Sequence, residues 1–179
     1  MSVKIIYFVH GTTTDNEAGK CTGWAGGELS ELGTKQAKEL KNQIKEKDFE
    51  VMFCSDLKRA VDSVDLGFNG YCPIIQDERL RECNYGDLTQ ADDSLVDYTK
   101  HIDAPFPGGE SMKDVERRMK VFLDYLKREH DNKFIAILAH KAPQLALEVL
   151  LNGKTWEQAI NEDWRNRKAW QPGWIYTVG

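Results

Sequence analysis

Two short apolar runs, each ending at a histidine, are the features that most constrain how this chain can fold. Val3–Val9 is rich in β-branched and aromatic residues and stops at His10. Phe134–Ala139 is apolar throughout, is bounded by charged residues and stops at His140, a pattern typical of a central strand buried on both faces. If the two strands are parallel neighbours, both histidines lie at the sheet edge where α/β proteins bind ligands.

Amphipathic segments alternate with these and other short strand candidates. Apolar periodicity predicts helices over Leu29–Lys47, after Val51–Cys54, from Ser111 onward, over Ala142–Leu151 and over Trp156–Trp164. Further strands are predicted at Val51–Cys54, Cys72–Ile75 and Trp174–Val178. Ser55-Asp56 is expected to cap one helix, and Ser111 with Asp114 resembles a capping box. The alternation favours an α/β fold, a three-layer sandwich with a mostly parallel central sheet flanked by helices on both faces.

Composition narrows the class of protein. The chain has 179 residues, of which 41% are hydrophobic and 30% charged, values typical of one globular domain over residues 1–179. Its net charge of −5 argues against a nucleic-acid coat. No apolar run approaches the about 20 residues that span a bilayer, and the four cysteines form no CxxC or zinc pattern. We therefore expect a cytoplasmic protein without a bound metal, a nucleic-acid partner or a membrane partner.

Several short motifs follow one another in an order that carries more information than any one of them. They are YFVHGTTTDN at 7–16, LSELG at 29–33 with QA at 36–37, CSDLKRA at 54–60, LRE at 80–82 with YGD at 85–87, PGGES at 107–111 and ILAH at 137–140. Together they resemble the histidine phosphatase superfamily, whose fold is called phosphoglycerate mutase-like. The resemblance covers nearly the whole chain and implies an α/β sandwich around a mostly parallel sheet.

The resemblance also implies catalytic roles. His10 matches the nucleophilic histidine, Arg59 the phosphate-clamping arginine, His140 the second histidine and Glu82 the acid that protonates the leaving oxygen. These residue types suit the chemistry, because a neutral imidazole is a good nucleophile near pH 7. Phosphoryl transfer otherwise needs positioning and positive charge around the phosphoryl oxygens, which an arginine fork supplies.

Three loop residues match substrate-contacting positions of the same family. Thr13 and Asn16 match positions that contact phosphate or substrate, and Gly23 matches a glycine whose backbone approaches the substrate. None of the chemistry that the resemblance implies requires a cofactor.

One position departs from the family's pattern. An arginine normally precedes the nucleophilic histidine, and here that position is Val9. Losing one charge-assisted hydrogen bond to phosphate costs roughly 1.5–3 kcal/mol. Either another cation replaces it, for which Lys141 and Lys20 are the candidates, or the protein is a catalytically weakened module that binds phosphorylated ligands.

The sequence thus favours a phosphomonoesterase that acts through a phosphohistidine on a small phosphorylated metabolite. Two alternatives stay open: mutase-type phosphoryl transfer between phosphoglycerates, and a non-catalytic phospholigand-binding protein. Four of the five tryptophans lie between Trp156 and Trp174. Packing against the core is the expected role of this tail, with a substrate pocket or a homodimer interface as the alternatives.

Overall fold

A computed structural model describes residues 2–45 and 48–179 and shows one five-stranded sheet. Its strands are β1 (Val3–Val9), β2 (Val51–Cys54), β3 (Ile74–Gln76), β4 (Phe134–Ala139) and β5 (Trp174–Val178). They lie in the order β3-β2-β4-β1-β5, and all neighbours are parallel except β5, which runs antiparallel to β1. The two apolar runs that end in histidines are therefore parallel neighbours at the centre of the sheet, as the sequence predicts.

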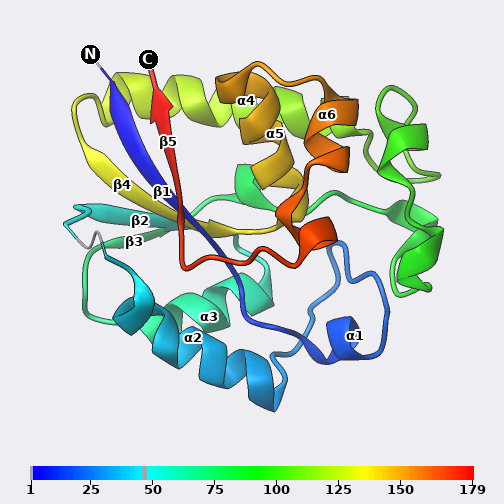
Figure 1. Ribbon diagram of the computed structural model, residues 1–179, viewed down its shortest axis with the longest axis horizontal. Helices are drawn as coiled ribbons and strands as arrows, with labels where there is room; N and C mark the ends of the chain where they lie inside the picture. Colours follow the sequence, from blue (N-terminus) through cyan, green and yellow to red (C-terminus); the bar gives the residue numbers. More distant parts are fainter. Residues whose placement is uncertain (1, 46–47) are drawn as a thin grey trace.

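Helices cover both faces of this sheet (Figure 1). The described helices are α1 (Thr14–Glu17), α2 (Glu31–Gln43), α3 (Lys58–Phe68), α4 (Met112–Glu129), α5 (Lys141–Asn152) and α6 (Trp156–Asn161). Helices α2 and α3 lie on one side, whereas α4, α5 and α6 lie on the other. The predicted three-layer α/β sandwich is confirmed. None of the described helices combines the length and the apolar character that crossing a bilayer requires.

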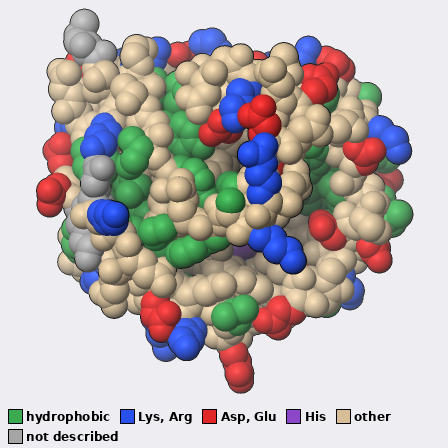
Figure 2. Space-filling model, in the orientation of Figure 1, with side chains coloured by type: hydrophobic (Ala, Val, Ile, Leu, Met, Phe, Trp, Pro, Cys, Tyr) green, Lys and Arg blue, Asp and Glu red, His purple; other side chains and the backbone are tan. Residues whose placement is uncertain are grey.

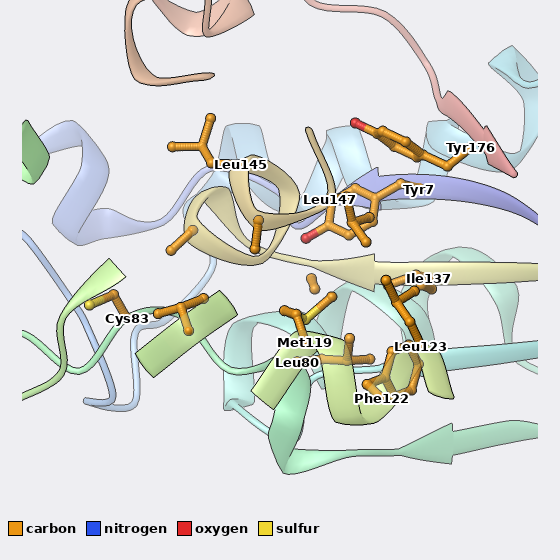
Figure 3. Packing of buried hydrophobic residues seen from close by; sticks show 14 of the residues in the cluster. Tyr7, Leu80, Cys83, Met119, Phe122, Leu123, Ile137, Leu145, Leu147 and Tyr176 are labelled. Atoms are coloured by element: carbon orange, nitrogen blue, oxygen red, sulfur yellow. The ribbon is translucent and has the colours of Figure 1, made fainter. Parts of the chain in front are cut away.

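Two hydrophobic clusters hold the layers together, because side chains alternate across a strand. Val3, Ile5 and Tyr7 of β1 belong to the cluster that packs against α4 and α5. Figure 3 shows part of this cluster, with residues from the sheet lying beside those of the helices. Ile6 and Phe8 point the other way, into the cluster beneath α2 and α3. The strand is buried on both faces, which explains its uninterrupted apolar sequence from Ile5 to Val9.

One predicted helix cap is confirmed and one is wrong. Ser111 caps α4, since its Oγ accepts from the backbone N–H of Asp114 at 3.1 Å and Asp114 Oδ2 accepts from the Ser111 N–H at 2.8 Å. By contrast, α3 begins after Leu57, which makes no side-chain cap. Ser55 lies too early and accepts from the Leu57 N–H instead, while Asp56 is paired with the Arg81 guanidinium.

Element boundaries shift by a few residues where the periodic signal is weak. The helix predicted over Leu29–Lys47 spans Glu31–Gln43, and Lys47 lies outside the described residues. The strand predicted at Cys72–Ile75 begins two residues later. The helix predicted to reach Trp164 ends at Asn161. Short 3₁₀ helices lie between β3 and α4 and between α6 and β5. They are η1 (Glu78–Leu80), η2 (Gly86–Leu88), η3 (Asp93–Leu95), η4 (Tyr98–His101) and η5 (Trp164–Arg167).

Candidate active site

The two strand-end histidines meet at the carboxyl edge of the sheet. Val9 is in register with Ala139, so the next residue of each strand, His10 and His140, is placed beside the other. Their ring centroids are 5.0 Å apart, with the ring planes inclined at 57°. The convergence expected from the two parallel strands is confirmed.

A backbone carbonyl selects the tautomer of His10. Nδ1 lies 2.7 Å from the carbonyl oxygen of Gly11. A carbonyl can only accept a hydrogen bond, so in the neutral ring Nδ1 carries the proton and Nε2 keeps its lone pair. Nε2 is therefore the nitrogen with nucleophilic capacity.

His140 is buried and is held by its backbone rather than by its ring. The Tyr7 hydroxyl donates to the His140 carbonyl at 2.7 Å and accepts from its N–H at 3.1 Å. Neither ring nitrogen of His140 has a hydrogen-bond partner among the residues that the structure describes. Buried polar atoms are nearly always paired in folded proteins, so a ring with both nitrogens free is suited to contact a ligand.

Arg59 brings a guanidinium from the first turn of α3 to the same place. Its side chain is almost fully buried, and its Nη1 and Nη2 donate to the carbonyls of Ala25 and Gly23 at 3.1 and 2.8 Å. Gly23 has a φ of +52°, and a Cβ there would lie 3.1 Å from the Tyr85 ring. The arginine is thus tied to the loop after α1, and a glycine permits the close turn of that loop.

Glu82 places a carboxyl group at the N-terminus of α5. Its Oε1 accepts from the backbone N–H groups of Cys83 and Ala142, both at 2.9 Å, and its Oε2 accepts from that of Lys141 at 3.2 Å. Its carbonyl accepts from Trp24 Nε1 at 2.7 Å and Arg118 Nη2 at 3.0 Å. Oε2, with one backbone donor, is the oxygen that has capacity left for proton transfer.

These groups line one cavity of about 500 Å³. Figure 2 shows a hollow in which a histidine side chain is visible below Lys and Arg side chains. Seven of the eight predicted site residues line the cavity, namely His10, Asn16, Gly23, Arg59, Glu82, His140 and Lys141. The structure does not bring Thr13 there. Its buried hydroxyl caps α1 by accepting from the Asn16 N–H at 3.0 Å, and the neighbouring Thr12 lines the cavity.

Both proposed replacement cations also reach the cavity wall. Lys20 and Lys141 line it. Lys141 Nζ lies 3.7 Å from Asp163 Oδ2 and 4.7 Å from the centre of the Tyr98 ring. Lys141 therefore shares its charge with a buried carboxylate before any ligand is present.

The sequence analysis assigned no site role to several other residues of the cavity. Tyr85 and Tyr98 come from the weakly patterned segment after Gln76, and Trp164 and Arg165 come from the tail. The cluster of tryptophans was the only sequence signal for the tail residues. Trp164 stacks on Trp174, with ring centroids 5.0 Å apart, so the tail both packs on the sheet and lines the cavity.

The environment keeps both histidines neutral. Burial, followed by the positive charge of Arg59, lowers the pKa of His10 to about 3. The same two causes hold the pKa of His140 well below its ordinary value. A neutral His10 retains its Nε2 lone pair across the physiological pH range.

The depressed histidine pKa values predict that acid destabilises the fold. Histidines in the unfolded chain titrate near pH 6.5, so below that pH the unfolded state takes up protons that the folded state does not. The free energy of unfolding is then independent of these groups above about pH 7.5 and falls as the pH drops toward 4, by up to about 1.4 kcal/mol per pH unit per histidine.

Urea denaturation at pH 7 and pH 5 tests this. Wild type should lose about 2 kcal/mol more than a His10→Asn/His140→Asn variant over that interval, once the partial exposure of His10 is allowed for. Equal losses in the two proteins would show that these rings titrate normally.

Comparison with known proteins shows the family to which the chain belongs. A sequence profile of the histidine phosphatase superfamily (branch 1) matches residues 6–167. Phosphoserine phosphatase 1 of Hydrogenobacter thermophilus is 28% identical over 162 residues, which cover 84% of this chain and 77% of that protein. The 2,3-bisphosphoglycerate-dependent phosphoglycerate mutase of Methylorubrum extorquens is 30% identical over 164 residues, 82% of this chain and 77% of that protein.

A solved structure shares the fold. The mycobacterial glucosyl-3-phosphoglycerate phosphatase in complex with VO3 superposes with a TM-score of 0.75 over 87% of this chain and 85% of that one, at 26% identity. The fold and the histidine-lined cavity define an α/β protein of the phosphoglycerate mutase-like type. The chain belongs to the histidine phosphatase superfamily, and its named relatives are phosphatases and mutases.

Proposed function

We propose that the protein is a phosphomonoesterase that works through a phosphohistidine at His10. The observation that carries the proposal is the convergence of a free imidazole Nε2, a buried guanidinium and a carboxyl group on one cavity. His10, Arg59 and Glu82 arrive there from three separate elements. The cavity is large enough for a small phosphorylated metabolite.

The reaction has two steps. In the first, the Nε2 lone pair of His10 attacks phosphorus, a P–N bond forms, and the ester P–O bond breaks as Glu82 protonates the departing alcohol oxygen. In the second, Glu82 takes a proton from water, whose oxygen attacks phosphorus and breaks the P–N bond. Inorganic phosphate leaves, and the neutral His10 is restored.

The hydrogen-bond donors of the cavity have a defined role in both steps. Arg59 and the His140 ring face the position next to His10, where the phosphoryl oxygens would lie. Donors fixed in advance stabilise the charge that develops on those oxygens without reorganisation. Asn16, Gly23 and Lys141 would contact the phosphoryl group or the alcohol portion of the substrate.

A panel of phosphomonoesters, assayed for phosphate release, tests the function. Release from at least one of them, together with slower interconversion of phosphoglycerates in a coupled mutase assay, is the expected result. Faster mutase turnover than hydrolysis would instead favour the phosphoglycerate mutase activity named for a relative that is 30% identical. Binding of phosphate without turnover of any ester would make the protein a phospholigand-binding module.

Glu82→Gln should slow hydrolysis of an alkyl phosphate by about 10²-fold or more, because the alkoxide then departs without a proton donor. Hydrolysis of p-nitrophenyl phosphate should be slowed much less at the phosphorylation step, because nitrophenolate is a good leaving group. Pre-steady-state release of the alcohol measures that step for both esters. An equal loss for the two would indicate that the substitution acts by disturbing the N-terminus of α5.

A further inference from the structure

The 3₁₀ helix η5 near the end of the chain contributes a second arginine to the cavity. Arg165 lies in the cavity wall with His10, Arg59 and His140. None of the steps above uses it.

Surrounding groups hold the Arg165 side chain in position. Its Nη1 donates to Asp163 Oδ1 at 3.0 Å, and its Nη2 donates to Gln144 Oε1 at 3.3 Å. Its guanidinium carbon lies 4.3 Å from the centre of the Trp164 ring. Asp163 and Gln144 are only 4% and 2% exposed, so the partners themselves are fixed. The guanidinium therefore loses little conformational entropy when it binds a ligand.

Arg165 has N–H donors and positive charge left with which to bind a ligand in the cavity. A guanidinium has five N–H groups, and acceptors among the described residues take two of those of Arg165. The carboxylate of Asp163 faces both Arg165 and Lys141, whose Nζ is 3.7 Å away. One negative charge shared by two cations leaves the cluster net positive toward the cavity.

The position of η5 supplies a cation on the side of the cavity where β1 ends in the apolar residue Val9. Val9 packs with the cluster on the α4–α5 side of the sheet and also lines the cavity, so β1 directs no donor side chain into it from that side. Gln144 on α5 anchors Arg165 on this same side. Burial is the main cause of the low pKa of both His10 and His140, and the charge of Arg165 lowers them further. The guanidinium lies in the same cavity wall as both rings.

We propose that Arg165 binds the non-bridging oxygens of the phosphoryl group and forms a two-arginine clamp with Arg59. This inference rests on the proposed function, because the proposed function is what identifies the ligand of the cavity as a phosphoryl group. The three equatorial oxygens of a transferring phosphoryl group carry more charge than one guanidinium can pair with. The second clamp comes from the tail of the chain rather than from the central strands.

Arg165→Met tests the clamp, with Arg167→Met as the matched control. Arg167 belongs to the same 3₁₀ helix but is exposed and does not line the cavity. Arg165→Met should raise the Kd for inorganic phosphate and for orthovanadate at least tenfold. It should also lower kcat/KM for p-nitrophenyl phosphate by about 10²-fold. The control should stay within twofold of wild type.

A rescue experiment distinguishes the loss of the contact between Arg165 and phosphate from a disturbance of the 3₁₀ helix η5. Adding Val9→Arg to Arg165→Met brings a guanidinium into the cavity from β1. The double variant should bind phosphate at least tenfold more tightly than Arg165→Met. Val9→Arg alone should increase the phosphate affinity of wild type by a smaller factor. No recovery, with Arg165→Met folded by circular dichroism, would overturn the clamp.

The two proposals fail in different ways. If wild type releases phosphate and Arg165→Met matches it in both Kd and kcat/KM, the clamp is wrong and the phosphatase function stands. If wild type turns over no ester, yet binds phosphate at least tenfold more tightly than Arg165→Met, the clamp stands and the phosphatase function is wrong.

Discussion

His10→Ala will abolish phosphate release, lowering kcat by on the order of 10⁴-fold or more, because in the proposed mechanism the phosphoryl group is transferred to His10 Nε2. The only other imidazole in the cavity wall, among the described residues, is that of His140. Its backbone is held by the Tyr7 hydroxyl. Steady-state kinetics with any ester that wild type hydrolyses measures the loss. The variant should still bind inorganic phosphate, because Arg59 remains.

His101→Asn is the control for this substitution. His101 lies in η4, stacks on Phe106 with ring centroids 3.8 Å apart and does not line the cavity. It should keep wild-type kcat within about twofold. If His10→Ala retained more than a hundredth of wild-type activity, a different nucleophile, such as water attacking phosphorus directly, would carry the reaction.

Arg59→Met is expected to have the second largest effect, a loss of about 10³-fold in kcat/KM. Its guanidinium combines two functions, since it faces the cavity and also holds the carbonyls of Gly23 and Ala25. Removing it leaves these carbonyls without their donor, so the free energy of unfolding should also fall, by about 1–3 kcal/mol. Steady-state kinetics and urea denaturation measure the two losses separately.

Two further variants distinguish charge from geometry at this position. Arg59→Lys keeps the positive charge, but a lysine cannot donate to two carbonyls and a phosphoryl oxygen at once. Its kcat/KM should therefore regain less than a tenth of what Arg59→Met loses relative to wild type. Lys58→Met removes the adjacent exposed cation, which pairs with Glu28 and Asp62, and should leave kcat/KM unchanged. Full activity in Arg59→Lys would mean that positive charge alone suffices.

The sequence predicted the architecture best where hydrophobic patterning was strong. The apolar runs Ile5–Val9 in β1 and Phe134–Ala139 in β4 indicated central strands, and the parallel order of those strands placed His10 beside His140. The capping box of α4 was found because both of its residues are local in sequence. The cap predicted for α3 failed because Asp56 pairs instead with Arg81, which is distant in sequence.

Prediction was weaker where the chain lacks periodicity. Tyr85 and Tyr98 reach the cavity from a segment of short 3₁₀ helices that has neither a strand nor a helix period. Arg165 reaches it only because η5 is anchored through Asp163 and Gln144. The contact with Gln144 joins residues 21 positions apart, so a local sequence pattern does not predict it. Arg59 and Glu82 were found through the family's motifs rather than through periodicity.

Trapping of the covalent intermediate tests the central claim most directly. Wild-type protein and His10→Ala are mixed with a radiolabelled phosphomonoester that wild type hydrolyses, quenched within milliseconds and digested for peptide mapping. The mechanism predicts an acid-labile phosphoramidate on the wild-type peptide that contains His10, attached at Nε2, and no label on His10→Ala. Label on another residue, or an active wild-type protein that never carries label, would contradict the assignment of His10 as the nucleophile.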